Sequence, residues 1–404
     1  RFQEEYSLRF KDKLSEGAFA VVYSAAQVGR VGAADVAVKI ADLKPAGDKG
    51  AKPKAVSGAD EAFRHKAVRR EVRAWMVASG PINVCRYVES FIGEDCAYLV
   101  SEMCDRSFYD ALEQTDPLNE DSFRPLLKGM LTGLSFVHAR AIVHRDIRPA
   151  NFMCCGPENT VKLRDFGSAC VLSSRDATEC VGVSGKLPFM APEMLRRLPY
   201  GVQVDMWSMG VIVYSICLGR FPYARAAASR NDAAGIAMKA SIMSGSPEPV
   251  FHSGGWEMSA DLERLVRGLL GRDPEARTSS REALEQSYFS AQILPRRCLR
   301  SALHLARHSG AFGSSRSSHF RSKRAAEDPS RASGKGVSDV LFSGSSGATE
   351  EKRLAASEIR ISSRSDASTA IPADGSVSIV TQGSRSVQAR IMEAGGQAPC
   401  RMSL

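Results

Sequence analysis

The sequence predicts an α+β protein with a β-rich front part, a helical centre and a disordered tail. Residues 8–40 alternate apolar and polar positions in short β-branched runs, which is typical of half-buried strands. The longest apolar run, residues 209–219, has the length of a buried core helix and is shorter than the ~18 residues that cross a bilayer. The last 114 residues hold 23 serines and few aromatic residues. Such a composition cannot bury enough apolar surface to fold.

The front part reads as a small antiparallel sheet whose strands are joined by hairpins. Gly17 interrupts the first pair of strands, within the run LSEGAFAVVY at residues 14–23. A glycine-rich turn lets the backbone approach a phosphate closely, although a plain hairpin explains the run equally well. The third strand, residues 35–40, carries Lys39 among apolar neighbours. By itself this lysine is equally well explained as a surface residue.

A charged helix is predicted after the sheet's third strand. Residues 44–59 are rich in Lys, Gly and Pro and predict an exposed loop, and the helix follows at about residues 61–77. Glu71 and Trp75 lie one turn apart on one face of this helix. From there the Glu71 carboxylate can pair with Lys39 and hold its ammonium group in place to bind a polyphosphate.

Three ordered motifs occupy the centre of the chain. They are HRDIRPAN at residues 144–151, DFG at residues 165–167 and APE at residues 191–193. Singly, their acidic and amide residues have structural explanations, as turn caps or as partners of a neighbouring arginine. A structural role does not require all of them in this order and at these separations. Together with residues 14–23, Lys39 and Glu71, the motifs resemble the eukaryotic protein-kinase fold over about residues 8–289.

The resemblance implies a bilobal fold. A β-rich small lobe is expected at residues 8–104, a helical large lobe at 105–289, and a basic, Ser-rich disordered tail at 290–404. Asp205 stands where this family has the buried anchor of a central helix. Arg277 stands where the family has the arginine that pairs with the glutamate of the APE motif.

The resemblance also implies phosphoryl transfer from ATP with Mg²⁺ as the metal. Mg²⁺ prefers hard oxygen ligands, which Asn151 and Asp165 offer. Asp146 would accept or orient the proton of the substrate hydroxyl. Arg148 stands where serine/threonine kinases have a lysine beside the transferring phosphate, and it keeps the charge. The predicted catalytic residues are Asp146, Arg148, Asn151, Lys39 and Glu71.

The adenine base is expected at a hinge between the lobes, residues 97–105. Backbone groups of Glu102 and Cys104 would hydrogen bond to the base, and Ser101 occupies the gatekeeper position. Apolar residues on both sides of the ring would complete a slot of the kind that holds planar ligands, and the same residues also suit an ordinary core. The residues predicted to bind the nucleotide are Leu14, Gly17, Val22, Ala37, Lys39, Ser101, Glu102, Cys104, Met153 and Asp165.

The sequence departs from the family in two places. Ser15 and Ala20 replace the first and third glycines of the loop, and each adds a Cβ where the backbone should contact phosphate. Lys186 replaces the threonine that ties the activation segment to the catalytic aspartate. The function predicted is a serine/threonine protein kinase, most similar to the calcium/calmodulin-dependent group. The alternative is a pseudokinase scaffold that binds nucleotide or partners without turnover.

The net charge of +9 lies mainly in the tail, where residues 291–404 hold 17 Lys or Arg against 9 Asp or Glu. No aromatic residues interleave these arginines, so we predict no nucleic-acid partner. Residues 291–310 include a candidate basic amphipathic helix, which suits either calmodulin binding or a packed terminal helix that fades into disorder. The expected partners are therefore protein substrates with Ser or Thr acceptors, and calmodulin at residues 291–310.

The ten cysteines favour a reducing compartment. They form no CxxC pair, and the adjacent Cys154 and Cys155 have no histidine at metal-ligand spacing, which argues against a zinc site. We predict a cytoplasmic or nuclear protein without a membrane span. Because the chain begins at Arg1 rather than Met, the location is unknown if an N-terminal segment is missing.

Overall fold

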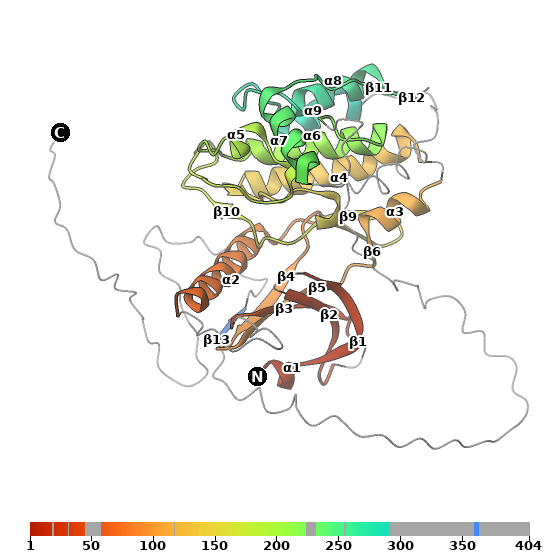
Figure 1. Cartoon of the computed structure of the whole chain (residues 1–404). Helices are drawn as coiled ribbons and strands as arrows, with labels where there is room; N and C mark the ends of the chain where they lie inside the picture. Colours follow the sequence, from red (N-terminus) through yellow and green to blue (C-terminus); the bar gives the residue numbers. More distant parts are fainter. Residues whose placement is uncertain are drawn as a thin grey trace, which may run out of the picture.

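The computed structural model describes residues 1–17, 20–30, 32–44, 58–116, 118–223, 232–253, 256–290 and 359–362. Most of the predicted loop at residues 44–59, the candidate helix at 291–310, and the rest of the tail after Ser290 other than residues 359–362 lie outside this described part. Within it, a strand-rich N-terminal sheet is followed by a helical region, as the fold class predicts (Figure 1). The predicted lobe boundary at residues 104 and 105 stays a prediction.

The N-terminal sheet is antiparallel and has the strand order β1-β2-β3-β5-β4-β13. The Gly17 amide donates to the Ala20 carbonyl over 2.8 Å and closes the first hairpin, as predicted. In β3, Lys39 lies opposite Val22 of β2 and Leu99 of β5. Alternate residues of β3 therefore present Ala37 and Lys39 on one face of the sheet. The five strands before the tail are β1 (Tyr6–Glu16), β2 (Ala20–Gln27), β3 (Val36–Asp42), β4 (Tyr87–Ile92) and β5 (Cys96–Glu102).

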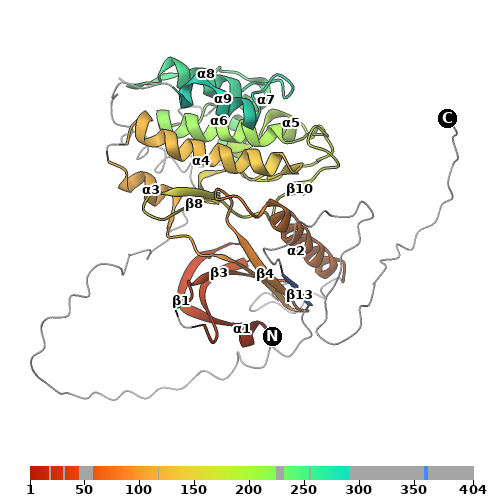
Figure 2. The same ribbon diagram turned by 180° about the vertical axis from the view of Figure 1, so that it is seen from behind.

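The sixth strand comes from far along the chain. β13 (Ile359–Ser362) pairs with β4, with Ile359 opposite Ile92 and Ser362 opposite Glu89. Both ribbon views place it beside β4 (Figures 1 and 2). β13 occupies the hydrogen-bonding edge that β4 would otherwise leave open. The composition of the tail did not predict this pairing.

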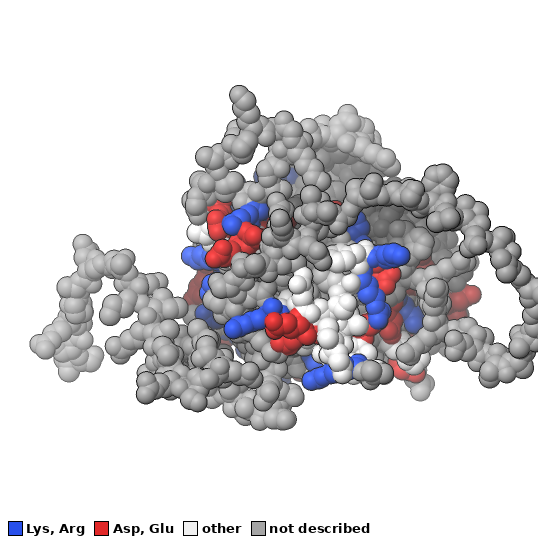
Figure 3. Space-filling model, turned by 90° about the horizontal axis from the view of Figure 1, so that it is seen from below, with Lys and Arg blue, Asp and Glu red and all other residues white. Residues whose placement is uncertain are grey.

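A small aromatic core lies at the start of the chain, before the predicted lobe boundary at residue 8. α1 (Phe2–Glu5) places Phe2 against Tyr98, with ring centroids 4.1 Å apart, and against Phe91. The Tyr6 hydroxyl donates to the Glu89 carboxylate over 2.6 Å. The folded N-terminal part therefore begins before residue 8, with α1 packed on the sheet and β1 starting at Tyr6. Seen from this end, the described residues show an uncharged patch flanked by side chains of both charge signs (Figure 3).

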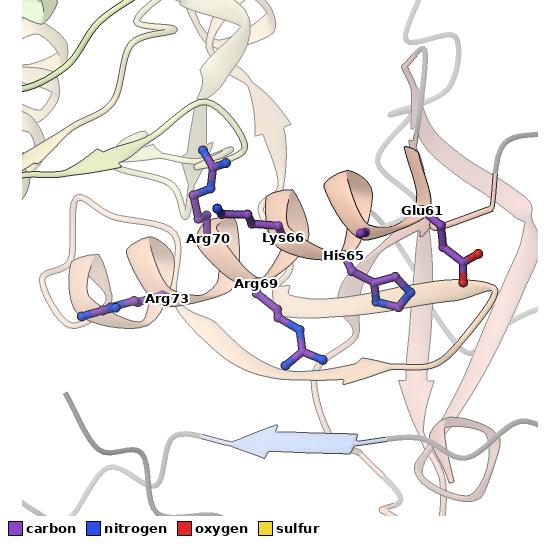
Figure 4. Close-up of a pocket in the computed structure, with 7 residues that line it drawn as sticks. Glu61, His65, Lys66, Arg69, Arg70 and Arg73 are labelled. Carbon is purple, nitrogen blue, oxygen red and sulfur yellow. The ribbon is translucent and has the colours of Figure 1, made fainter. Parts of the chain in front are cut away.

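The predicted charged helix is α2 (Gly58–Ala78). Its inner face buries Glu71 and apolar residues that include Val72 and Trp75. Its outer face exposes the cations Lys66, Arg69, Arg70 and Arg73. Figure 4 shows Arg70 directed toward the helical region and Arg69 directed away from it. The helix thus separates a solvated basic face from a buried face that carries one carboxylate.

The helical region is built around α6 (Gln203–Leu218), in which every residue from Val204 to Leu218 is buried. This helix matches the apolar run seen in the sequence and ends at Gly219, whose φ of 68° is the left-handed conformation that glycine adopts readily. α4 runs beside α6 (Figure 1). The other helices are α3 (Phe108–Gln114), α4 (Glu120–His138), α5 (Pro192–Leu195), α7 (Asp232–Ser244), α8 (Ala260–Leu269) and α9 (Ser280–Glu285).

Short strands and 3₁₀ turns lie where the sheet meets the helices. β6 (Arg106–Ser107), β8 (Phe152–Cys155) and β9 (Thr160–Leu163) form a three-stranded sheet, and β7 (Ile142–Val143) pairs with β10 (Cys170–Val171). The remaining elements are η1 (Pro149–Asn151), η2 (Leu187–Phe189), η3 (Ser287–Phe289), β11 (His252–Ser253) and β12 (Trp256–Glu257). Among the described residues, no helix combines the length and apolar character needed to cross a bilayer.

Candidate active site

Lys39 lies at the centre of a three-residue charge cluster. Its Nζ is 2.6 Å from Oε1 of Glu71 on α2 and 3.1 Å from Oδ1 of Asp165, which follows β9. The predicted ion pair between Lys39 and Glu71 is therefore present. Three segments that are distant in the sequence, β3, α2 and the DFG motif, meet at one ammonium group.

The opposite charges of Lys39 and Asp165 stabilise each other's ionised forms. Burial alone would lower the pKa of Lys39, but the neighbouring Glu71 and Asp165 carboxylates outweigh burial and raise the pKa above its ordinary value. The Lys39 ammonium in turn holds the pKa of Asp165 well below the usual range. Burial raises the pKa of Glu71, although Lys39 opposes this shift. Lys39 thus stays cationic and Asp165 stays anionic at neutral pH.

The backbone at Asp165 is held in an unusual conformation. Its φ is 66°, in the left-handed region that non-glycine residues adopt at a cost of about 1–3 kcal/mol. The next residue, Phe166, is fully buried, with its ring 6.2 Å from that of Trp75 and 5.2 Å from that of His144. Packing of Phe166 therefore fixes the backbone turn that aims the Asp165 carboxylate at Lys39.

A second polar cluster lies in residues 144–151, the predicted catalytic loop. The Asn151 side-chain amide donates to Oδ2 of Asp146 over 2.9 Å and to the Asp146 carbonyl over 2.7 Å. Arg148 donates from Nε to the same Oδ2 over 3.2 Å. Asp146, Arg148 and Asn151 therefore lie in direct contact, with the Asp146 carboxylate held by two donors.

The two clusters are neighbours through the backbone. The amide of Arg164 donates to the Asn151 carbonyl over 2.9 Å, which places Asn151 beside Asp165. The Asn151 amide nitrogen Nδ2 is bonded to Asp146, and no residue in the described part of the chain donates to its side-chain oxygen. Asp165 keeps a second carboxylate oxygen, and its side chain is 41% exposed. One amide and one carboxylate oxygen fit the hard ligands that Mg²⁺ prefers, so the predicted metal residues suit that ion.

Asp205 of α6 holds the backbone at the start of the catalytic loop. This fully buried carboxylate on α6 accepts from the amides of His144 and Arg145, each over 2.8 Å. Oδ2 also lies 3.0 Å from Nε2 of His138. The sequence predicted Asp205 as a buried anchor but missed His138, because a histidine at the end of an amphipathic helix carries no motif.

The activation segment makes two further contacts that bear on the site. Arg277 forms two hydrogen bonds to Glu193, of 2.6 and 3.1 Å, as the motif order predicted. Gly185, at a φ of 88°, packs against the catalytic loop so closely that an added Cβ would lie 2.6 Å from the Arg145 carbonyl. Gly185 belongs to none of the sequence motifs, so its contact with the loop was not predicted. Lys186 beside it is exposed.

The predicted adenine site lies along one side of the sheet and its connection to the helical region. Ser101 is opposite Ala37, and Glu102 is fixed by a 2.8 Å ion pair with Lys162 of β9. No described residue accepts a hydrogen bond from the backbone amide of Cys104. Met153 lies on β8 opposite Lys162, Val22 lies opposite Lys39, and Leu14 is in β1. Val22 therefore lies beside Lys39 on the sheet, whereas Glu102 and Met153 lie toward β8 and β9.

Comparison with known proteins agrees with this geometry. A family model described as protein kinase domain matches residues 8–289. The chain is 30% identical over 233 residues to the phosphorylase b kinase gamma catalytic chain, liver/testis isoform, of Homo sapiens, covering 55% of this chain and 54% of that protein. It is 28% identical over 292 residues to calcium/calmodulin-dependent protein kinase type 1 of Macrobrachium nipponense, covering 71% and 76% respectively.

A third relative, calcium/calmodulin-dependent serine/threonine-protein kinase 1 of Oryza sativa subsp. japonica, is 30% identical over 226 residues, covering 54% of this chain and 35% of that protein. The chain spans 54% of the length of the human and mouse phosphorylase b kinase chains. The predicted similarity to the calcium/calmodulin-dependent group is thus confirmed in the names of the relatives. Because the family model covers well over half of the sequence, the chain belongs to the protein kinase family.

Proposed function

We propose that this chain is an active serine/threonine protein kinase that transfers the γ-phosphoryl group of ATP to protein hydroxyls, with Mg²⁺ as its metal. The observation that carries the proposal is the Lys39 ammonium, held by Glu71 and Asp165 beside the loop that contains Asp146 and Asn151. Phosphoryl transfer depends mainly on positioning and charge stabilisation, and this arrangement offers both.

Each residue of the site has a distinct task in this proposal. Lys39 binds the phosphates, and Glu71 keeps its ammonium in place. Asn151 and Asp165 would hold Mg²⁺, which neutralises charge on the phosphates when bound. Asp146 orients the acceptor hydroxyl and accepts its proton, while Arg148 supplies a cation next to the carboxylate. The donors from Asn151 and Arg148 restrict the Asp146 carboxylate to one orientation.

The glycine turn supports a phosphate site in spite of its two substitutions. An added Cβ at Gly17 would meet only the Ala20 carbonyl, at an ordinary contact distance of 3.6 Å. The described fold therefore has room for a side chain at this position and does not itself require glycine. The fold alone gives no reason for a glycine at position 17. A close approach of the backbone to a phosphate would give such a reason.

The test is turnover of labelled ATP with Mg²⁺ and a serine-rich acceptor protein. Asp165→Asn is expected to abolish transfer by weakening the metal site, and Lys39→Met by loosening the phosphates, while both variants stay folded. Lys128→Met on the exposed face of α4 is the matched control and should keep full activity. Wild-type turnover in either site variant would refute the mechanism. Nucleotide binding without turnover in the unaltered chain would identify a pseudokinase instead.

We also propose calmodulin as a partner at residues 291–310, which lie outside the described part of the chain. The support is the basic amphipathic pattern and the calcium/calmodulin-dependent names of several relatives. Titration of a peptide of residues 291–310 with calmodulin and calcium should show binding, and truncation after Phe289 should change the activity of the chain. No binding together with unchanged activity would eliminate the proposal.

A further inference from the structure

The outer face of α2 carries four exposed cations in the middle of the helix. We call Lys66, Arg69, Arg70 and Arg73 the cation face. None of these four side chains forms an ion pair or a hydrogen bond with another residue in the described part of the chain. Together with Glu61, Ala62 and His65 they line an open pocket, and every described residue in its lining belongs to α2 (Figure 4). The cation face thus has no partner within the described fold.

The spacing of these cations opposes helix formation. Residues three and four positions apart are neighbours on a helix surface, and like charges there repel each other. Each member of the cation face has two other members at such spacings, and no Asp or Glu stands three or four positions from any of them. The helix dipole favours cations in the last turn, where α2 has no basic residue. Helix stability therefore gives no reason for the cation face.

The arginines of α8 and α9 show how this fold balances such charges elsewhere. Arg264 and Arg267 of α8 each lie 2.7 Å from a carboxylate oxygen one turn earlier in the helix. Arg281 of α9 lies 3.1 Å from a carboxylate oxygen one turn later. In contrast, α2 concentrates cations and omits the acidic neighbours that would balance them.

We propose that the cation face binds an acidic peptide segment of a partner protein, with three or more consecutive Asp, Glu or phosphoserine residues. Seven residues separate Lys66 from Arg73, which corresponds to about 10 Å along the helix axis. An extended peptide rises about 3.3 Å per residue, so about three residues span this length. The arginine guanidinium binds carboxylates and phosphates through two parallel hydrogen bonds. Figure 4 shows Arg69 and Arg70 on opposite flanks of the helix, which suits an extended polyanion better than a single ion.

The lining of the pocket favours a peptide over other polyanions. Single-stranded nucleic acids are held by stacking on aromatic rings as well as by charge, and none of the described lining residues is Phe, Tyr or Trp. The exposed Phe63 of α2 is not part of this lining. A helix that lies in a membrane surface presents its apolar face to lipid, whereas Val72 and Trp75 on the apolar face of α2 are buried in the core.

Binding at the cation face would also bear on the Lys39 cluster. Glu71 follows Arg70 directly and lies on the inner face of α2, where its carboxylate holds the Lys39 ammonium. A bound polyanion would reduce the repulsion along α2 and stabilise the turn that carries Glu71. This consequence for phosphoryl transfer rests on the proposed function, whereas the binding of the peptide does not.

The experiment measures binding to the full chain by fluorescence anisotropy. The probe is a fluorescein-labelled peptide with six consecutive aspartates, and the control peptide has asparagines in their place. One variant replaces all four residues of the cation face by Gln, which is a good helix former. The matched control variant also replaces four exposed cations by Gln and therefore changes the net charge equally. Its substitutions are Lys128→Gln, Arg264→Gln, Arg267→Gln and Arg281→Gln.

We expect the aspartate peptide to bind the wild type and to be weakened by added salt, and the asparagine peptide not to bind. The cation-face variant should lose at least tenfold in affinity, and the control variant should stay within about twofold of the wild type. The cation-face variant should also melt no lower than the wild type, because it removes repulsion between like charges. An equal loss of affinity in both variants, or a lower melting temperature of the cation-face variant alone, would overturn the proposal. Tighter binding of a 12-residue oligouridine or of phosphatidylserine vesicles at the same four residues would overturn the assignment to a peptide.

Phosphorylation of a serine-rich acceptor protein then tests the link to Glu71. Saturating aspartate peptide should raise the rate of the wild type and leave that of the cation-face variant unchanged. An unchanged wild-type rate with the peptide bound would refute this link. Absence of turnover both with and without the peptide would refute the proposed function, and the anisotropy measurement would still decide whether the cation face binds the peptide.

Discussion

Gly185 allows a test of how the activation segment holds the catalytic loop. Its φ is 88°, and a Cβ added there would lie 2.6 Å from the Arg145 carbonyl and 3.2 Å from Oδ1 of Asp146. Gly182, three residues earlier, has nearly the same φ of 87°, but a Cβ there would meet nothing within 4 Å. Gly185→Ala and Gly182→Ala therefore impose the same backbone strain and differ only in the contact with the catalytic loop.

The expected magnitudes follow from these two contributions. A non-glycine residue in the left-handed region costs about 1–2 kcal/mol, so both variants should melt a few degrees lower. A carbon atom at 2.6 Å from a carbonyl oxygen forces a local shift of several tenths of an ångström. Because a misplacement of about 1 Å can cost ~100-fold in rate, we expect kcat of Gly185→Ala to fall by about 10- to 100-fold.

The assay is steady-state phosphorylation together with thermal melting of both variants. Gly182→Ala should keep kcat within about threefold of the wild type, because its strain does not reach the reacting groups. KM for ATP should change little in either variant, since neither glycine lies at the predicted nucleotide site. Equal losses of kcat in the two variants, or full activity in Gly185→Ala, would refute the proposed contact between segment and loop.

Three further predictions concern buried charges and a thiol. Glu193→Gln leaves the fully buried Arg277 guanidinium without its carboxylate and should lower the free energy of unfolding in denaturant by about 3 kcal/mol. The control Glu263→Gln removes one partner of a more exposed pair with Arg267 and should lower the free energy of unfolding by under about 0.5 kcal/mol. Asp205→Asn should lower kcat more than it raises KM, because two loop amides and His138 then compete for one side-chain oxygen. An unchanged kcat would contradict the role of Asp205 in positioning the loop. The rate of Cys155 alkylation should rise at a lower pH than that of free cysteine, because the lowered pKa of Cys155 leaves more thiolate at neutral pH. Cys104→Ser should shift this pH dependence of the alkylation rate back toward higher pH.

Local patterns in the sequence predicted much of the fold. The alternation at residues 8–40 corresponds to β1, β2 and β3, and the charged helix predicted at about residues 61–77 is α2. The apolar run at residues 209–219 lies in α6, which begins six residues earlier, at Gln203. Two features were not predicted because they depend on distant partners. Phe2 is buried only because Phe91 and Tyr98 come to meet it. β13 pairs with the edge of β4 across more than 250 residues of sequence.

The candidate site was predictable to the extent that it consists of motifs. Lys39, Glu71 and Asp165 meet as expected, because their residue types and order identify the family. The backbone bond between Asp105 and Cys154 was not predictable, since it depends on the register of β6 against β8 and not on any spacing along the chain.

Asp205 shows why a core helix can also be part of the site. Its neighbours in α6 are buried on all sides, so hydrophobic periodicity distinguishes no face of the helix. The pattern therefore identifies none of its residues as functional. A buried carboxylate is stable only when its oxygens are satisfied, and here two donors are backbone amides of the catalytic loop. The same burial that makes Asp205 costly to remove makes its geometry rigid. The loop that carries Asp146 is thereby fixed to the most buried helix of the fold, and the activation segment, through Gly185, restrains it from the other side.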